Sequence, residues 1–181
     1  MTHGSAQAEA VTGPRYGAFQ TTALVALRLV VGWHFFYEGL AKLLNPYWTS
    51  AGYLADSKWW LKDLLIDVAA SPTAVTVVDL LNQWGLLLIG LGLMLGLLTR
   101  AAAIAAVALL ALYYFAAPPW VGYTYAMPAE GSYLVVNKIV VEAAALLVLL
   151  AFPTHHVFGL DRFLPLRKRG AAGAASQPAG A

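Results

Sequence analysis

The chain has 181 residues, of which 60% are hydrophobic and 11% are charged, and its formal net charge is +2. Soluble domains are typically about half apolar and about one quarter charged, so this composition excludes an ordinary soluble domain and indicates an integral membrane protein. The small net charge argues against nucleic acid as a partner. The absence of cysteine excludes disulfides, thiolate metal sites and a CxxCH haem attachment site.

The N-terminal residues 1–20 are mostly small and polar, which predicts a disordered cytoplasmic segment. A first membrane-spanning helix is predicted from about Thr22 to Leu44, because this stretch is long and apolar enough to cross a bilayer. The Asn45-Pro46 pair ends it, since the residue before a proline disfavours the helical conformation.

The first spanning helix carries a stripe of ionisable residues, namely Arg28, His34, Glu38 and Lys42. A helix turns by about 100° per residue, which places these side chains within about one third of its circumference. Ionisable groups inside a membrane are costly and face other protein rather than lipid. The stripe therefore predicts a polar contact between this helix and its neighbours.

The connector from Tyr47 to Ser71 is rich in tryptophan and tyrosine, which favour the membrane–water boundary. Ser57 is a candidate N-cap for a short helix with one apolar and one charged face. That helix is too polar to cross the membrane, and we expect it to lie in the interface.

Three further spans follow. Ser71-Pro72 is a good helix start, and the second span continues to Thr99. The third span follows at once and is closed by Pro118-Pro119, and a second aromatic connector leads to a fourth span from about Tyr133 to Phe152. The predicted fold class is all-α, a four-helix transmembrane bundle with a short interfacial helix in the first outer connector.

We expect one membrane domain over residues 21–165 and a basic, then disordered, C-terminal tail over residues 166–181. Lysine and arginine beside the spans favour the side that also holds both termini. We therefore predict a multi-pass protein of the inner (cytoplasmic) membrane, with both termini in the cytoplasm and the aromatic connectors outside. This topology explains the basic run at residues 167–169, and recognition of lipid headgroups or of a partner is the alternative.

The predicted topology brings polar residues of three helices to the outer part of the bundle. Across helices, Glu38 with Lys138 and Lys42 with Glu142 are both compatible pairs. Either these groups pair to fix the helix register without chemistry, or they form a site for a small polar substrate or a quinone headgroup. The whole group comprises Glu38, Lys42, Asp79, Asn82, Gln83, Asn137, Lys138 and Glu142.

Two residues of the stripe allow two interpretations each. Histidine is the residue type whose ordinary pKa lies near neutral pH. His34 would therefore either relay protons or contact a quinone, or be a neutral histidine bonded to a neighbouring helix. Arg28 would either snorkel toward the cytoplasmic interface or bind an anion or carbonyl oxygen within the bundle, and its place on the stripe favours the second. His155 and His156 lie at the inner surface, which argues against a bis-histidine haem with His34. No haem and no metal site is predicted.

Several motifs, in this order, resemble the DoxX/DoxD family of small four-helix membrane proteins: RLVVGWHFFYEGLAKL, GLGLMLGLLTR, NKIVVEAAALLVLL and FGLDRFL. The resemblance covers about Leu24 to Leu164. The connector NPYWTSAGYL is similar to DoxD, the larger subunit of thiosulfate:quinone oxidoreductase. The resemblance to DoxD implies a small partner subunit and transfer of electrons from thiosulfate to membrane quinone, with tetrathionate as the product. Other relatives are associated with redox-stress complexes.

The leading hypothesis is a quinone-linked membrane redox subunit that oxidises thiosulfate or a related small reductant. Protons would be handled by the candidate catalytic residues Glu38, His34 and Glu142. The substrate or the quinone acceptor would be bound by Arg28, Lys42, Asp79, Gln83, Asn137 and Lys138. Expected partners are membrane lipid, a small redox partner subunit and a second copy of the chain.

The alternative function is a non-enzymatic membrane anchor or assembly partner of a separate redox protein, which the absence of cofactor motifs favours. A small-solute transporter is a third and weaker hypothesis, since the sequence shows no inverted repeat.

Overall fold

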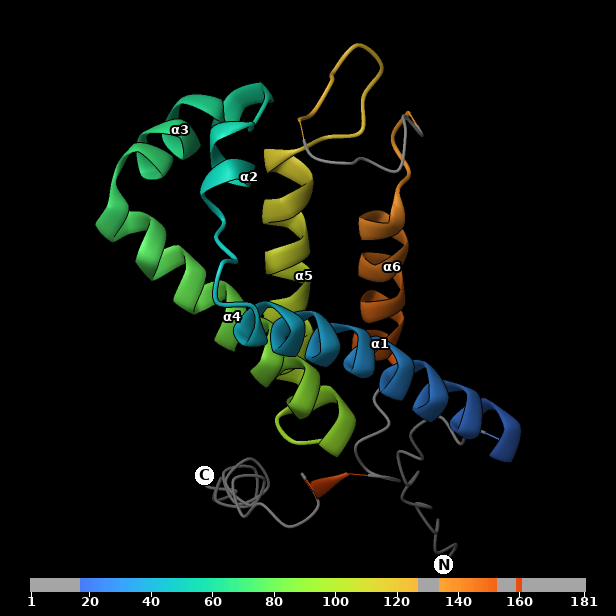
Figure 1. The fold of residues 1–181 in the computed structure, drawn as a ribbon. Helices are drawn as coiled ribbons and strands as arrows, with labels where there is room; N and C mark the ends of the chain where they lie inside the picture. Colours follow the sequence, from blue (N-terminus) through green and yellow to red (C-terminus); the bar gives the residue numbers. More distant parts are fainter. Residues whose placement is uncertain (1–16, 127–133, 153–158, 161–181) are drawn as a thin grey trace, which may run out of the picture.

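The computed structural model describes residues 17–126, 134–152 and 159–160, and every regular element within them is helical (Figure 1). The long helices are α1 (Ala18–Leu44), α4 (Pro72–Leu95), α5 (Thr99–Ala116) and α6 (Lys138–Ala151). The connector between α1 and α4 holds α2 (Ala51–Ala55), the 3-10 helix η1 (Trp59–Leu61) and α3 (Lys62–Ala70). The predicted all-α fold class is confirmed.

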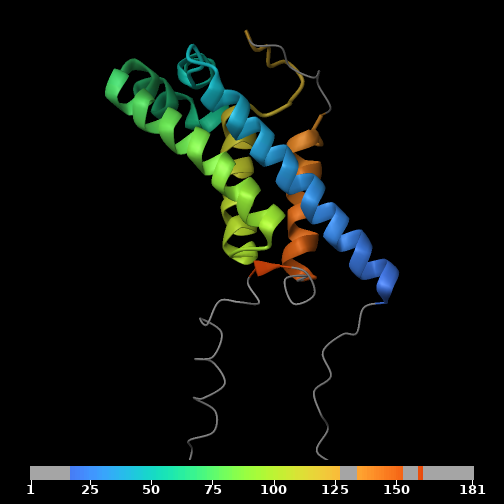
Figure 2. The same ribbon diagram turned by 60° about the horizontal axis from the view of Figure 1, so that its bottom comes forward.

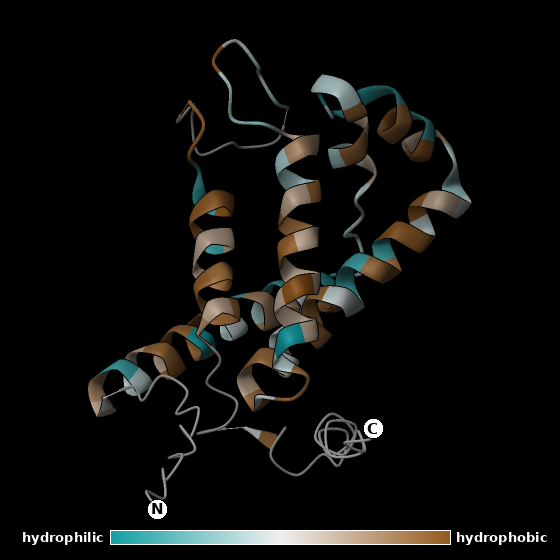
Figure 3. Cartoon of the chain, turned by 180° about the vertical axis from the view of Figure 1, so that it is seen from behind, coloured by the Kyte–Doolittle hydropathy of each residue, from teal (hydrophilic) through white to brown (hydrophobic). Residues whose placement is uncertain are grey.

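The helices α1, α4 and α5 are long and apolar enough to cross a membrane. Figure 3 shows hydrophobic residues over most turns of the long helices, interrupted by isolated hydrophilic positions. α6 has 14 residues. At 1.5 Å per residue this is about 21 Å, less than the hydrocarbon core of about 30 Å. The fourth predicted span is therefore shorter as a helix than expected, because it begins at Lys138 rather than near Tyr133.

The ends of α4 follow from local sequence signals. The helix begins at Pro72 with Ser71 as its N-cap, and the Ser71 hydroxyl accepts a backbone N–H bond at 3.4 Å, as predicted. It ends at Leu95 rather than at Thr99. The reason is Gly96, whose left-handed φ of 65° ends the helix and whose missing side chain makes that conformation inexpensive.

α1 and α4 cross so closely that only glycine fits at the contact. A Cβ placed on Gly39 of α1 would lie 2.5 Å from the backbone nitrogen of Leu87. A Cβ on Gly90 of α4 would overlap the backbone of Phe36. A Cβ placed on Gly32, two turns earlier in α1, would lie 2.9 Å from the side chain of Met94 in α4. Small residues at a helix crossing let two backbones touch in a membrane protein. Here these glycines let α1 pack closely against α4.

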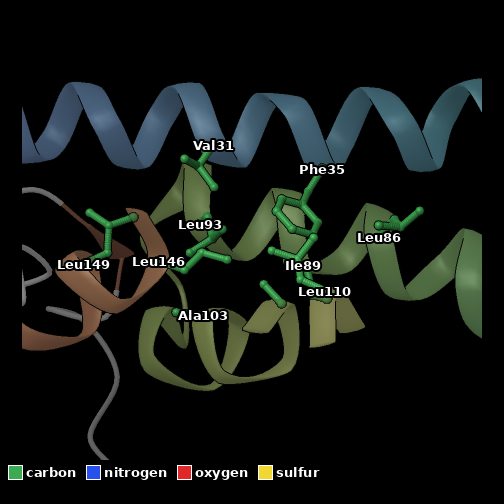
Figure 4. Close-up of a cluster of buried hydrophobic side chains, with 10 residues drawn as sticks. Val31, Phe35, Leu86, Ile89, Leu93, Ala103, Leu110, Leu146 and Leu149 are labelled. Carbon is green, nitrogen blue, oxygen red and sulfur yellow. The ribbon is translucent and has the colours of Figure 1, made fainter. Parts of the chain in front are cut away.

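The four long helices share one hydrophobic core beneath this crossing (Figure 4). Phe35 is 2% exposed, and Leu93 and Leu146 are fully buried. In Figure 4, Val31 and Phe35 point from α1 toward the leucines and isoleucine of α4. The buried members of the core are Val31, Phe35, Leu86, Ile89, Leu93, Ala103, Ala106, Leu110, Leu146 and Leu149.

Different elements lie at the two ends of the molecule. The start of α1, the turn between α4 and α5 and the end of α6 lie toward one end (Figure 2). α2, α3 and the segment that follows α5 lie toward the opposite end (Figure 2). The arrangement puts both aromatic connectors on one side of the core, in agreement with the order of elements expected from the sequence.

The first connector is more folded than predicted. The expected short helix is present as α3, but Ser57 is not its N-cap: the Ser57 hydroxyl donates to the carbonyl of Leu54 at 2.7 Å and closes α2 instead. The sequence does not predict α2 or η1. A serine hydroxyl can bond either to a carbonyl at the end of one helix or to an N–H at the start of the next. Here the Ser57 hydroxyl bonds to the Leu54 carbonyl at the end of α2.

Asp56 ties this connector to the segment after α5. Its carboxylate accepts hydrogen bonds from Lys58 Nζ at 2.8 Å and from the backbone N–H of Ala126 at 2.6 Å. The Lys58 bond, followed by the Ala126 bond, holds the pKa of Asp56 below its usual value. The backbone N–H of Lys58 also donates to the carbonyl of Ala116 at 3.0 Å. The two aromatic connectors are therefore bonded to each other, and the first is bonded to the end of α5.

The predicted N-terminal segment up to residue 16, the basic run at residues 167–169 and the C-terminal tail lie outside the described residues. His155 and His156 lie outside them as well. The domain boundaries stay predictions.

Candidate functional site

A cavity of about 290 Å³ lies among α1, α4, α5, α6 and the segment from Trp48 to Tyr53. Phe35, Leu86 and Leu110 line it and also belong to the hydrophobic core, so the cavity sits directly on the end of that core nearest α2. Ile139 of α6 completes the apolar side. Its polar lining consists of His34, Glu38, Lys42, Thr49, Ser50, Tyr53, Asn82, Tyr113, Lys138 and Glu142.

His34, Glu38 and Lys42 form the α1 edge of the cavity. They are four residues apart, so successive turns of α1 present them on one face, as the stripe predicts. Gly39 of α1 and Gly90 of α4 hold these two helices in close contact beside this face. The sequence expectation that this edge meets other helices is confirmed by its contacts.

His34 reaches α6. Its Nε2 lies 3.0 Å from a carboxylate oxygen of Glu142, and the two side chains are 45% and 23% exposed. An imidazole bonded to a carboxylate can hold a proton between them and pass it on. The pair bridges α1 and α6, and the His34 side chain remains almost half exposed there.

The Lys42 side chain is more buried than that of His34, with only 19% of it exposed. Its Nζ is 3.6 Å from Glu38 and donates to Asn82 Oδ1 at 3.2 Å. The same ammonium lies over two rings, 5.2 Å from the centroid of Trp48 and 5.7 Å from that of Tyr113. A cation so surrounded is fixed in place and is partly compensated by the rings, which preorganises it to bind an oxygen atom in the cavity.

Tyr113 of α5 is held from two sides. The Asn82 amide donates to its hydroxyl oxygen, and the Tyr53 hydroxyl donates to its backbone carbonyl at 2.9 Å. The rings of Tyr53 and Tyr113 meet edge to face at 6.1 Å. Burial raises the pKa of Tyr53 above its usual value, so that hydroxyl stays a neutral donor. These contacts join α2, α4 and α5 at one wall of the cavity.

Ser50 forms the remaining polar wall. Its backbone N–H donates to Asp79 of α4 at 2.7 Å, which anchors the chain after α1. The Ser50 side chain is buried, with 6% of the residue exposed, yet within the described residues its hydroxyl has no hydrogen-bond partner. A buried hydroxyl without a partner is costly, and Ser50 is one of the residues that line the cavity.

The predicted site residues divide into two groups. His34, Glu38, Lys42, Lys138 and Glu142 line the cavity, and the structure brings them together from α1 and α6. The others, which do not line it, are Arg28, Asp79, Gln83 and Asn137.

Two members of the second group accept hydrogen bonds from backbone N–H groups. Asp79 accepts the Ser50 N–H. Asn137 is the N-cap of α6, and its side chain accepts from the backbone of Val140 at 3.2 Å. Arg28 is 1% exposed and lies six residues before His34 in α1, about 9 Å along the helix axis. The interpretation of these residues as binding groups stays a prediction.

Sequence reasoning missed the α5 contribution. Tyr113 falls on the same face as Ala106 and Leu110, at the spacing of a buried helix face. The Tyr113 hydroxyl on this buried face of α5 is the sequence signal for its place in the site. Tyr53 and Trp48 were interpreted only as boundary aromatics, and Asn82 only as one member of the polar cluster. Within the described part of the chain, no three His, Asp or Glu side chains are placed to hold a metal ion.

The lining therefore joins three chemical features in one small space. There is an apolar side, a set of hydrogen-bond donors around Lys42 and Tyr113, and a histidine–carboxylate pair that joins α1 to α6. Such a lining can hold a small ring that carries oxygen atoms, orient it, and exchange protons with it.

The sequence model described as DoxX matches residues 23–119, which run from α1 through α5 and end before α6. No curated protein and no solved structure matches the chain. The match covers more than half of the chain, including His34, Lys42, Asn82 and Tyr113 of the cavity. The chain is a member of the DoxX family.

Proposed function

We propose that this protein is a quinone-linked membrane redox subunit whose cavity holds the quinone headgroup. The observation that carries the proposal is the lining itself, which combines hydrogen-bond donors and a His34–Glu142 pair with an apolar side. Electrons would come from thiosulfate or a related small reductant, as the similarity to DoxD implies. Membership of the DoxX family supports a membrane location, and the finer assignment to the DoxD branch is part of this proposal.

In the proposed topology α6 is the fourth membrane segment, completing a four-helix transmembrane bundle. The protein lies in the inner membrane of the cell, and both of its termini lie in the cytoplasm. η1 and α3, with exposed Trp60 and Leu64 beside charged Lys62 and Asp63, lie in the outer interface. This topology puts the cavity near the outer boundary of the bilayer, where a quinone headgroup resides while its tail stays among the lipid chains.

The cavity fits such a headgroup. Ligand pockets for drug-sized molecules have volumes of about 300 to 1,000 Å³, so a space of about 290 Å³ accommodates one substituted ring. Ser50 offers a buried hydroxyl that a ligand oxygen would satisfy. The side exposure of His34 and Glu38, 45% for each side chain, supplies an entrance from the membrane between α1 and α6.

A bound quinone supplies an acceptor for two electrons and two protons. Lys42 holds a positive charge beside the oxygen atoms of the headgroup, and Lys138 adds a second at the mouth of the cavity. Glu38 keeps Lys42 in place through the 3.6 Å ion pair. The His34–Glu142 pair holds protons that the reaction consumes. Glu38 is a further proton carrier, and its ion pair with Lys42 is lost while it is protonated. Two thiosulfate ions become one tetrathionate ion when they release those two electrons.

The test is reduction of decylubiquinone by thiosulfate in membranes that contain the full chain. We expect thiosulfate-dependent loss of the oxidised quinone band together with tetrathionate formation, once any small partner subunit is present. A Lys62→Met variant serves as a control, since Lys62 is exposed on α3 and does not line the cavity. Binding of the quinone without any reduction, with a separate redox protein copurifying in stoichiometric amount, would assign the chain instead to the anchor role.

A further inference from the structure

The hydrogen bonds beside Lys42 have a fixed direction. A lysine ammonium can only donate, so the Asn82 oxygen must face Lys42, at 3.2 Å. The amide nitrogen of Asn82 then faces Tyr113 and donates to its hydroxyl oxygen. The order Lys42 to Asn82 to Tyr113 is therefore set by the one residue that has no acceptor, and it does not depend on how the amide oxygen and nitrogen of Asn82 are assigned.

This order leaves the hydroxyl hydrogen of Tyr113 available. A tyrosine hydroxyl has one hydrogen to donate, and within the described residues no acceptor for it is found. The backbone carbonyl of Tyr113 is already occupied by the Tyr53 hydroxyl, so the ring is held from both ends. The donor stands in the cavity wall, in the same wall as Lys42. Donor chains of this kind polarise one another, which strengthens the last donor.

We propose that Tyr113 donates a hydrogen bond to an oxygen atom of the bound headgroup, and that Asn82 is the positioning residue that aims it. The inference rests on the proposed function, since the ligand considered is a quinone. It adds a binding residue from α5 and states its direction: both the Lys42 ammonium and the Tyr113 hydroxyl offer donors here. A ligand oxygen bound to them accepts, as a quinone carbonyl does.

Asn82→Asp is the substitution that separates aiming from packing. A carboxylate has nearly the shape of the amide and still accepts from Lys42, but it has no hydrogen to give. Tyr113 would then donate to the new carboxylate, and its hydrogen would no longer reach the ligand. If Asn82 only held Lys42 and Tyr113 in place, Asn82→Asp would leave the binding of the quinone unchanged, because both neighbours would still be bonded to residue 82.

The experiment measures decylubiquinone binding to the purified full chain, together with the carbonyl stretching band of the bound quinone in infrared difference spectra. Tyr113→Phe removes one hydroxyl and should weaken binding by about 3- to 10-fold, as expected for one neutral hydrogen bond. The same variant should shift one carbonyl band back toward its unbonded frequency. Asn82→Asp should give a similar band shift, and adding Tyr113→Phe to it should cause no further shift.

Tyr114→Phe is the matched control. Tyr114 is the next residue of α5, its hydroxyl donates to the carbonyl of Val135 at 2.9 Å, and it does not line the cavity. Its removal should leave the band unchanged. Wild-type binding with an identical carbonyl band in Tyr113→Phe would overturn this inference alone. Failure of the wild type to bind the quinone would overturn the proposed function and this inference with it. If the phenylalanine variant does not fold, the Asn82→Asp band decides.

Discussion

Replacing Lys42 by methionine is expected to weaken binding of decylubiquinone by about 10- to 100-fold. Methionine keeps an unbranched side chain of similar reach but removes the charge, and hydrogen bonds to charged groups contribute about 1.5 to 3 kcal/mol. Lys42 is 19% exposed at its side chain and is ringed by Glu38, Asn82, Trp48 and Tyr113. The charge is therefore fixed beside the cavity rather than dispersed in solvent.

The measurement is the dissociation constant Kd of decylubiquinone, obtained from competition with a photoreactive azidoquinone. Lys62→Met removes an exposed lysine from α3 and is the matched control. Thermal midpoints of both variants show whether the fold is intact. Unchanged affinity in Lys42→Met, with an unchanged midpoint, would remove Lys42 from the site.

The second large effect is expected at the crossing of α1 and α4. In Gly90→Ala the new methyl group would overlap the backbone of Phe36, which cannot move aside as a side chain can. The two helices must separate, and overpacking of this kind typically costs about 1 to 3 kcal/mol. For a chain of this size, each kcal/mol corresponds to about 2 to 4 °C in the thermal midpoint. We expect the midpoint of the purified protein to fall by several degrees.

Gly85→Ala provides a control in the same helix, because a Cβ at Gly85 meets no atom within 4 Å. That variant should keep the midpoint or raise it slightly, since alanine favours a helix more than glycine does. Equal midpoints for the two variants would show that α1 and α4 do not touch at Gly90.

These glycines illustrate what the sequence alone does not reveal. The glycine pair most visible in the sequence is Gly92 with Gly96, but Gly96 ends α4 and does not pack between two helices. Gly39 and Gly90 lie in different helices, so no spacing within one segment relates them. Their importance follows only when the crossing point of α1 and α4 is known.

Much of the fold was predictable for simple reasons. Hydrophobic length marks α1, α4 and α5, and the Ser71-Pro72 pair marks the start of α4. α6 is the exception, because the apolar residues Leu134 to Val136 extend the hydrophobic stretch without forming part of the helix, which Asn137 caps.

The site was predictable where charge made it conspicuous. Ionisable residues in apolar helices stand out, and the α1 edge and Glu142 are found in this way. Asp79 and Asn137 were also conspicuous, but each satisfies a backbone N–H near a helix or connector end. Tyr113 and Ser50 are ordinary residue types, and their place in the cavity depends on how α5 and the segment after α1 fold against α4.

The central claim is that the cavity between α1, α4, α5 and α6 holds a quinone headgroup. The most direct test is photolabelling of the protein in membranes with an azidoquinone, followed by identification of the labelled residues by mass spectrometry. The account predicts labels on lining residues such as Trp48, Tyr53 and Tyr113, abolished by excess decylubiquinone. Labels confined to outward-facing residues such as Leu88 and Ile104, which are 60% and 58% exposed, and insensitive to competition would contradict it.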